Sequence, residues 1–109
     1  MSSNKSFLDF ILGQLATLPD ITYRAMMGEF IIYYRGKIVG GIYDNRLLVK
    51  PTAATSKLMP NAPMEIPFPG GKPMPMVQDI EDVDFLTTLF DAIYTELPNP
   101  KQKPRGQGK

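Results

Sequence analysis

The chain has 109 residues, of which 43% are hydrophobic, and its formal net charge is +1. These values indicate one small globular domain, and no apolar run reaches the ~18 residues that a membrane-spanning helix needs. The sequence contains no cysteine and no histidine, which excludes disulfides, thiolate or imidazole metal ligands and catalysis by imidazole.

A first helix is predicted near the N-terminus. Ser6 is a suitable N-cap, and Asp9 three residues later gives a weaker form of the capping box. Apolar residues at spacings of three and four predict one face packed on a sheet, up to Pro19: Phe7, Phe10, Ile11, Leu15 and Leu18. The N-terminus lacks the apolar stretch and cleavage site of a secretory signal, so we expect a cytoplasmic location.

Three strands rich in β-branched and aromatic residues are predicted next, at residues 29–34, 37–43 and 46–50. Only two residues separate successive strands, Arg35-Gly36 and then Asp44-Asn45. Such short turns need positive φ and join antiparallel neighbours, so the strands form a meander. We expect residues 18–23 to be a connector and residues 24–28 to lead into the first strand.

Period-2 alternation divides this meander into two faces. One is uncharged and is expected to lie under the helices: Ile31, Tyr33, Ile38, Gly40, Ile42, Leu47 and Val49. The other has cations at its rim: Phe30, Ile32, Tyr34, Val39, Gly41, Tyr43, Arg46, Leu48 and Lys50. Its apolar area is too large for a monomer to leave exposed. We expect a homodimer or the following proline-rich segment to cover it.

The middle strand contains Gly40-Gly41, which weakens pairing and leaves no side chain to pack. One interpretation is a flat window for the close approach of a partner or ligand. The alternative is a bulge, or space for a bulky neighbour.

Residues 51–59 are expected to form one or two helical turns. Six of the eleven prolines lie between Met59 and Met76. This proline content and the alternating apolar residues predict an edge hairpin that extends the meander or wraps its open side. A last helix, capped by Asp79 and ended by Pro98, carries one apolar stripe: Val83, Leu86, Leu89, Phe90, Ile93 and Leu97. We expect no metal and no cofactor.

Charge is distributed unevenly. Residues 101–109 carry four of the twelve Lys and Arg residues and no acid, so residues 1–100 hold eight cations against eleven acids. Residues 98–109 lack an apolar anchor and are predicted to be a disordered basic tail after a single domain at residues 1–97. An acidic body argues against a dedicated nucleic-acid-binding domain, although the tail and the turn cations allow weak, non-specific contact with phosphate.

The meander resembles the N-terminal domain of the TfoX/Sxy regulators. The matching features are an Arg, a Met and a Gly before a strand, an aromatic residue, a Gly-Lys turn and a final Lys: Arg24, Met26 or Met27, Gly28, Tyr33 or Tyr34, Gly36-Lys37 and Lys50. The resemblance covers roughly residues 10 to 97, although Met27 and Glu29 stand where the family often has Phe and a second Gly. It implies an α+β fold and a non-enzymatic role in the transcriptional control of DNA-uptake competence. Family members that regulate competence carry a second, C-terminal domain, and here the tail occupies that position.

The sequence thus predicts an α+β fold, with a meander extended by a proline-rich hairpin and two helices on one face. Its predicted function is that of a regulatory module that binds an unidentified protein, and the alternative is a nucleic-acid accessory protein. The candidate partner-binding residues are Arg24, Tyr34, Arg35, Lys37, Tyr43, Arg46 and Lys50. Of these, Arg24 is either a recognition contact or a structural guanidinium that pairs with a carboxylate or carbonyls.

Overall fold

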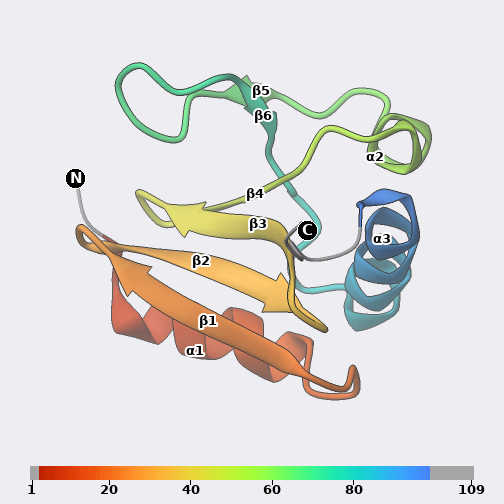
Figure 1. Cartoon of the computed structure of the whole chain (residues 1–109), viewed down its shortest axis with the longest axis horizontal. Coiled ribbons are helices and arrows are strands. Elements are labelled where there is room, and N and C mark those ends of the chain that lie inside the picture. Colours follow the sequence, from red (N-terminus) through yellow and green to blue (C-terminus); the bar gives the residue numbers. More distant parts are fainter. Residues whose placement is uncertain (1–2, 99–109) are drawn as a thin grey trace, which may run out of the picture.

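The computed structural model describes residues 3–98, which form the expected α+β fold (Figure 1). The elements in chain order are α1 (Lys5–Gln14), β1 (Ile21–Met26), β2 (Glu29–Tyr34), β3 (Lys37–Tyr43), β4 (Arg46–Val49), α2 (Ala53–Leu58), β5 (Met64–Glu65), β6 (Met74–Pro75) and α3 (Val83–Glu96). No helix in this part of the chain is long and apolar enough to cross a membrane. The predicted basic tail lies, from residue 99 onward, outside the described residues.

Strands β1 to β4 form one antiparallel sheet in sequence order. The three predicted strands are confirmed, the third ending one residue early at Val49. Both predicted turns are confirmed as well, because Arg35 and Gly36 have φ of 51° and 83°, and Asp44 and Asn45 have φ of 54° and 58°. Positive φ at both central residues defines a type I′ turn, whose twist suits neighbouring strands.

The strand β1 replaces the connector and lead-in that we expected at residues 18–28, so that prediction was wrong. Its six residues pair with β2 through a third two-residue turn, in which Met27 and Gly28 have φ of 53° and 86°. The strand was not predicted because its residues do not alternate between buried and exposed positions. Every residue from Thr22 to Met26 is exposed, so pairing with β2 and not burial holds the strand in place.

A bulge in β3 decides which side of the sheet is buried. Ile32 pairs with Gly40, whereas Tyr33 pairs with Ile38, so Val39 is an extra residue. Directly opposed residues share a face, and the shift therefore exchanges the faces of β2 relative to regular pairing. The sheet residues in the core are Ile32, Tyr34, Val39, Ile42, Leu47 and Val49.

The predicted assignment of faces is corrected by this bulge. The predicted face for the helices was right for β4 and for Ile42, but it included Ile31, Tyr33 and Ile38, which lie on the opposite face. Regular alternation cannot reveal one inserted residue when both sets of alternate residues in β2 are apolar.

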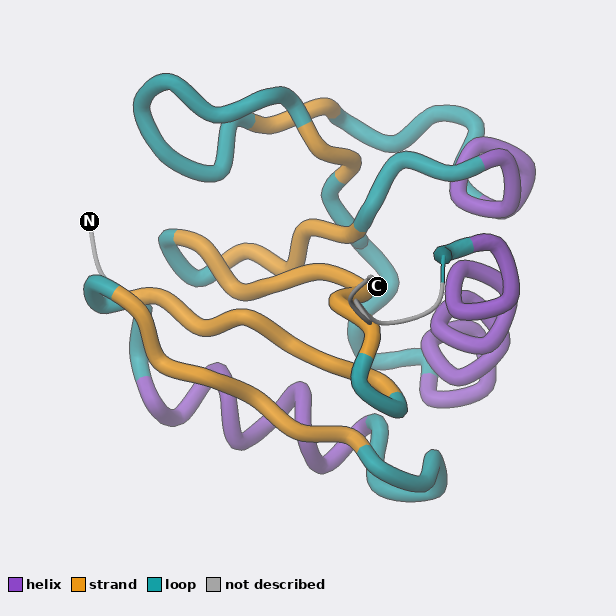
Figure 2. The backbone as a smooth tube through the Cα atoms, in the orientation of Figure 1, coloured by secondary structure: helices purple, strands orange, loops and turns teal. Residues whose placement is uncertain are grey.

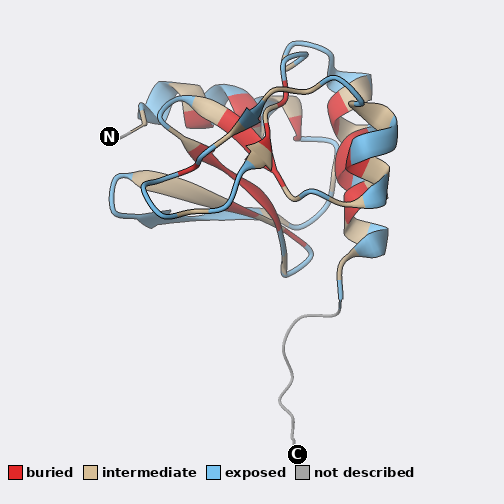
Figure 3. Cartoon of the chain, turned by 90° about the horizontal axis from the view of Figure 1, so that it is seen from above, coloured by how far each residue is buried: buried red, intermediate tan, exposed pale blue. Residues whose placement is uncertain are grey.

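Helices α1 and α3 supply the rest of the core. Their buried residues are Leu8, Ile11 and Leu15 at α1, and Leu86, Leu89, Phe90 and Ile93 in α3. Helix α1 runs along the sheet behind β1, and α3 stands at the end of the sheet beside the β2–β3 turn (Figures 1 and 2). The buried residues of α3 lie on its side toward the sheet (Figure 3).

The helix ends differ from the predicted ones. Helix α1 begins after Asn4, not Ser6, and Leu15 is its C-cap. Helix α3 begins after Asp82, whose carboxylate accepts a hydrogen bond from the Phe85 N–H, so the cap is three residues later than the predicted Asp79. Asp79 and Asp82 are both acids ahead of the apolar stripe, and sequence alone does not separate them.

The proline-rich segment forms the β5–β6 hairpin, a separate two-stranded sheet in which Met64 pairs with Pro75. Beyond this hairpin the chain runs along β4, where Met76 bridges to Leu48 and the Val77 N–H donates to the Leu47 carbonyl at 2.9 Å. The hairpin therefore continues into a strap of two residues, Met76 and Val77, that covers the outer edge of β4.

A charged residue introduced on the buried side of α3 tests whether this helix packs on the sheet as described. Replacing the fully buried Leu89 by Asp should lower the free energy of unfolding by about 3–5 kcal/mol, because the carboxylate would have no partner. Thr88→Asp, on the exposed side of the same helix, is the matched control and should change it little. Chemical denaturation of both variants measures the difference, and equal midpoints would contradict this packing.

Substitution of Gly40 tests the close approach of β3 and β4 beside the bulge. An added Cβ there would collide with the backbone of Leu48 and Val49, so Gly40→Ala should destabilise the fold by about 1–3 kcal/mol. Gly13 in α1 has nothing within 4 Å of an added Cβ, and Gly13→Ala should instead stabilise by up to ~1 kcal/mol. The melting temperature should therefore fall for Gly40→Ala and rise for Gly13→Ala. This result would support the interpretation that Gly40 provides space for a neighbouring strand.

Candidate protein-binding groove

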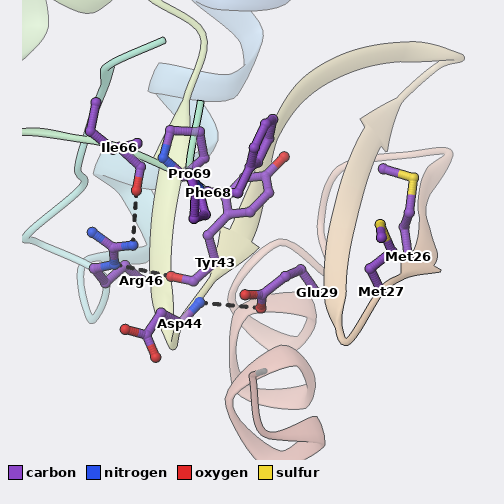
Figure 4. Close-up of a pocket in the computed structure, with 10 residues that line it drawn as sticks. Met26, Met27, Glu29, Tyr43, Asp44, Arg46, Ile66, Phe68 and Pro69 are labelled. Atoms are coloured by element: carbon purple, nitrogen blue, oxygen red, sulfur yellow. Dashed lines mark hydrogen bonds between the residues drawn. The ribbon is translucent and has the colours of Figure 1, made fainter. Parts of the chain in front are cut away.

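An open groove lies on the side of the sheet away from α1, at the end where two hairpin turns meet the proline-rich loop (Figure 4). Its volume is about 530 Å³. It is lined by Met26, Met27, Glu29, Tyr43, Asp44, Arg46, Ile66, Pro67, Phe68 and Pro69. Three segments that are distant in sequence thus contribute to one concave surface.

Large apolar side chains around this groove are unusually exposed. Met27 is 93% exposed, Phe68 54%, Met26 50% and Ile66 46%. Scattered exposed apolar residues need no explanation, but several around one concavity make this groove a candidate contact surface. Methionine also adapts its shape to irregular partners.

Local structure explains why these side chains remain outside the core. Met27 occupies the tip of the β1–β2 hairpin, where its positive φ belongs to the turn and its side chain has no neighbouring strand to cover it. Phe68 lies in the loop between β5 and β6, and its ring packs on Tyr43 with 6.2 Å between centroids. Tyr43 is therefore half-buried, and this burial, followed by the nearby Glu29 carboxylate, raises its pKa.

Arg46 holds the proline-rich loop against the sheet. Its guanidinium donates to Glu65 at 2.8 Å and to the Ile66 carbonyl at 3.2 Å, while its Nε donates to the Tyr43 carbonyl at 3.0 Å. The ion pair with Glu65 is partly shielded from water, and such charge-assisted bonds are the stronger ones. Arg46 thus builds one wall of the groove.

The remaining charges at the groove are acidic. The Glu29 carboxylate accepts hydrogen bonds from the Ser3 hydroxyl at 2.6 Å and from the Asp44 N–H at 3.2 Å. The Asp44 carboxylate makes no ion pair within residues 3–98. Because Glu65 neutralises Arg46, the rim presents net negative charge.

Three other predicted site residues contact the C-terminal end of α3 instead. Lys37 Nζ donates to the carbonyls of Tyr94 at 3.2 Å and Leu97 at 2.9 Å, and lies 4.2 Å from the centre of the Tyr94 ring. A cation at this end of a helix satisfies its free carbonyls and the helix dipole. Arg35 lies over the rings of Tyr34 and Tyr94 at 5.5 and 5.7 Å.

Tyr34 is buried beneath these cations. Only 3% of it is exposed, and its hydroxyl donates to Asp91 at 2.6 Å. Burial, followed by the hydrogen bond and negative charge of Asp91, raises the pKa of Tyr34 to about 12. Tyr34 therefore links β2 to α3 and is not available to a partner.

The seven predicted site residues consequently do not form one site. Tyr43 and Arg46 belong to the groove, and Tyr34, Arg35 and Lys37 support α3. Arg24 is exposed on β1 with no ion pair in the described part of the chain, and Lys50 follows β4. Within residues 3–98 these seven residues therefore do not form one continuous basic surface for a phosphate backbone.

Sequence reasoning missed the apolar half of the groove. Met26 and Met27 were identified only through the family resemblance. The alternating apolar residues of the proline-rich segment indicated a hairpin but not which of its sides is exposed. Within residues 3–98 no group of three or more acidic residues is placed to hold a metal ion.

The sheet face that was predicted to form a homodimer is largely covered within the chain. Of its residues, Ile32, Tyr34, Val39 and Leu48 are buried within the chain. The proline-rich segment covers part of the sheet through Met76 and through Phe68 on Tyr43. The apolar area left for a second subunit is thus smaller than the sequence indicated, and it is concentrated at the groove.

The described residues form a small α+β module, an antiparallel meander flanked by helices. It carries an apolar groove, and residues 3–98 contain no group of acidic residues placed to hold a metal ion. Residues 13–92 match the TfoX N-terminal domain, and the chain belongs to this family. It is also 30% identical over 104 residues to an uncharacterized 12.7 kDa protein in the trpE 5′ region of Spirochaeta aurantia, covering 94% of this chain and 90% of the relative.

Titration of Tyr34 gives a prediction for alkaline pH. A folded pKa of about 12 against an ordinary value of 10.0 means that its stabilising contribution is complete below pH 10 and is lost as pH rises to 12. For a buried group this loss is about 2–3 kcal/mol. Tyr34→Phe should lower the free energy of unfolding by about 1 kcal/mol at pH 7. Above pH 10, the free energy of unfolding of this variant should fall less steeply with pH than that of the unmodified protein.

The measurement is urea denaturation of both proteins at several pH values from 7 to 12. Tyr33→Phe is the control, because Tyr33 lies on the opposite face with its hydroxyl in no hydrogen bond among residues 3–98. If the curve of Tyr34→Phe falls as steeply as that of the unmodified protein, the coupling to Asp91 is wrong.

Proposed function

We propose that this protein is a non-enzymatic regulatory module that acts by binding another protein in the groove. The observation that carries the proposal is the gathering of four exposed apolar side chains around one concavity: Met26, Met27, Ile66 and Phe68. Membership of the TfoX family supports a regulatory role in the cytoplasm, in the transcriptional control of DNA-uptake competence.

The groove favours a particular chemistry in its partner. Its volume of about 530 Å³ is in the range of pockets that hold a drug-sized ligand, which leaves room for a large side chain of a partner. The carboxylates of Glu29 and Asp44 at the rim favour a positive charge beside that anchor. We therefore propose a partner segment with a large apolar residue next to Lys or Arg.

The polar groups of the groove support binding and not catalysis. Arg46 is engaged by Glu65, and Glu29 by Ser3 and Asp44. These contacts position the walls and leave no nucleophile paired with a base. The absence of histidine and cysteine from the whole sequence removes the side chains that most often fill such roles.

The nucleic-acid alternative has less support. Lys37 and Arg46 donate their hydrogen bonds within the chain, and residues 1–100 carry more acids than cations. A phosphate-binding surface would need free cations on one side of the molecule.

Substitution at the hairpin tip tests the proposal. Met27→Glu and, separately, Phe68→Glu should each weaken partner binding about 30-fold, the effect of losing a typical hot spot of ~2 kcal/mol. Both side chains are exposed, so thermal unfolding should change little. Ile38→Glu is the control, since Ile38 is an exposed apolar residue that does not line the groove.

The experiment begins with a photo-crosslinking amino acid at position 27 in the native cells, to identify the partner. Binding is then measured with the purified partner and each variant. Equal affinity of all variants would refute the groove as the docking surface. Self-association that Met27→Glu abolishes would instead make a second copy the occupant, as in the predicted homodimer.

A further inference from the structure

The outer edge of β1 has backbone groups arranged to bind another strand. A two-residue turn closes the β1–β2 hairpin, so Met26 and Glu29 exchange hydrogen bonds, and every second pair does the same: Met26 with Glu29, Arg24 with Ile31 and Thr22 with Tyr33. The hydrogen bond from the Arg35 N–H to the Asp20 carbonyl, at 3.0 Å, continues this series. The N–H and C=O groups of Ile21, Tyr23 and Ala25 consequently point away from the sheet.

These outward groups have no backbone or side-chain partner within residues 3–98. The opposite edge of the sheet differs, since the Leu47 carbonyl on β4 is bonded to Val77. One edge is therefore covered and the other is open. An open edge is a template for a further strand.

A second groove lies beside this edge, on the face that α1 covers. It has a volume of about 470 Å³ and lies between α1 with the turn that follows it and the first half of β1. Its apolar lining is Leu12, Leu15, Ala16, Leu18, Ile21 and Tyr23. In a strand added to β1, the side chains opposite Ile21, Tyr23 and Ala25 would lie on this face.

The other face of β1 carries Arg24, which is exposed and forms no ion pair among the described residues. A residue directly opposite Arg24 in an added strand would lie about 5 Å away between Cβ atoms. An acidic residue at that place would be favoured.

We propose that the β1 edge binds an extended segment of another protein as a fifth, antiparallel strand. Apolar residues of the segment lie opposite Ile21, Tyr23 and Ala25, and an acid lies opposite Arg24. The backbone supplies affinity, while the α1 groove and Arg24 supply specificity. This surface is distinct from the groove proposed above, because Met26 and Met27 line that groove on the other face.

A second copy of the chain fits the edge less well. Symmetric antiparallel pairing of the outward groups places Tyr23 against its counterpart and Arg24 against Thr22 of the other copy, which leaves Arg24 without an acid. Pairing centred on Arg24 would oppose two like charges.

The test uses a synthetic peptide with the core Val-Glu-Val-Thr-Val, flanked by Gly-Ser and Lys for solubility. Added antiparallel, its residues lie in order opposite Ala25, Arg24, Tyr23, Thr22 and Ile21. Titration into the ¹⁵N-labelled full chain should shift the amide signals of Ile21, Tyr23 and Ala25 most. Their fast hydrogen exchange should slow at least tenfold, while the amides of Arg24 and Met26 are protected throughout.

Matched peptides separate strand addition from simple apolar binding. N-methylation of the third residue removes an N–H that faces β1 and should abolish binding. N-methylation of the fourth residue removes an N–H that faces solvent and should leave binding unchanged. Replacing the Glu by Lys should weaken binding about fivefold with the natural chain and restore it with Arg24→Glu.

Variants of the edge complete the test. Ala25→Pro removes one outward donor without touching the β1–β2 ladder and should abolish binding, whereas Ala25→Val keeps the donor and should bind. No binding at millimolar peptide, equal binding of both N-methylated peptides, or shifts confined to Met27 and Phe68 would each overturn the proposal. Dimerisation of the unmodified protein that Ala25→Pro abolishes would also overturn it, by making a second copy the occupant.

Discussion

The insertion of one residue, Val39, into β3 is the constraint on which the rest of this structure depends. It turns Ile32 and Tyr34 toward the helices, and it lets the Tyr34 hydroxyl reach Asp91 on α3. Because β1 pairs in register with β2, the same insertion places Ile21 and Tyr23 on the α1 side. Gly40, next to the insertion, allows β3 and β4 to approach closely.

Both proposed binding surfaces follow from this arrangement. The groove at Met27 and Phe68 lies on the side of the sheet that the helices leave open, and the β1 edge borders α1 on the other side. With regular pairing, Tyr33 would occupy the place of Tyr34 and the two faces of β1 would be exchanged. The surface chemistry of the protein is therefore set by a feature inside its sheet.

Sequence reasoning predicted the parts of the fold that depend on local chemistry. The two turns follow from Gly36, Asp44 and Asn45, which accept positive φ, and the apolar stripe of α3 follows from helical periodicity. The bulge was not predictable, because Phe30, Ile32 and Tyr34 are as apolar as Ile31 and Tyr33. Strand β1 was missed because its residues are exposed and its turn, Met27-Gly28, is not a common hairpin pair.

The candidate site was predictable only in part. Tyr43 was predicted as an aromatic residue within a sheet face and Arg46 as a cation at the rim of that face, and both line the groove. Lys37 and Tyr34 had the same residue chemistry, yet they serve α3. A residue type does not tell whether a partner lies inside the chain. That information comes from tertiary packing, as does the placement of Met27 and Phe68 around one groove.

The three two-residue turns also have a consequence for the order of folding. Every pair of neighbouring strands in the main sheet is adjacent in sequence, so each hairpin closes a very short loop and loses little chain entropy. Helices α1 and α3 come from opposite ends of the described chain and meet in one core only when distant segments come together. The meander can thus assemble first and present the surface on which both ends condense, which favours fast folding for a protein with this much sheet.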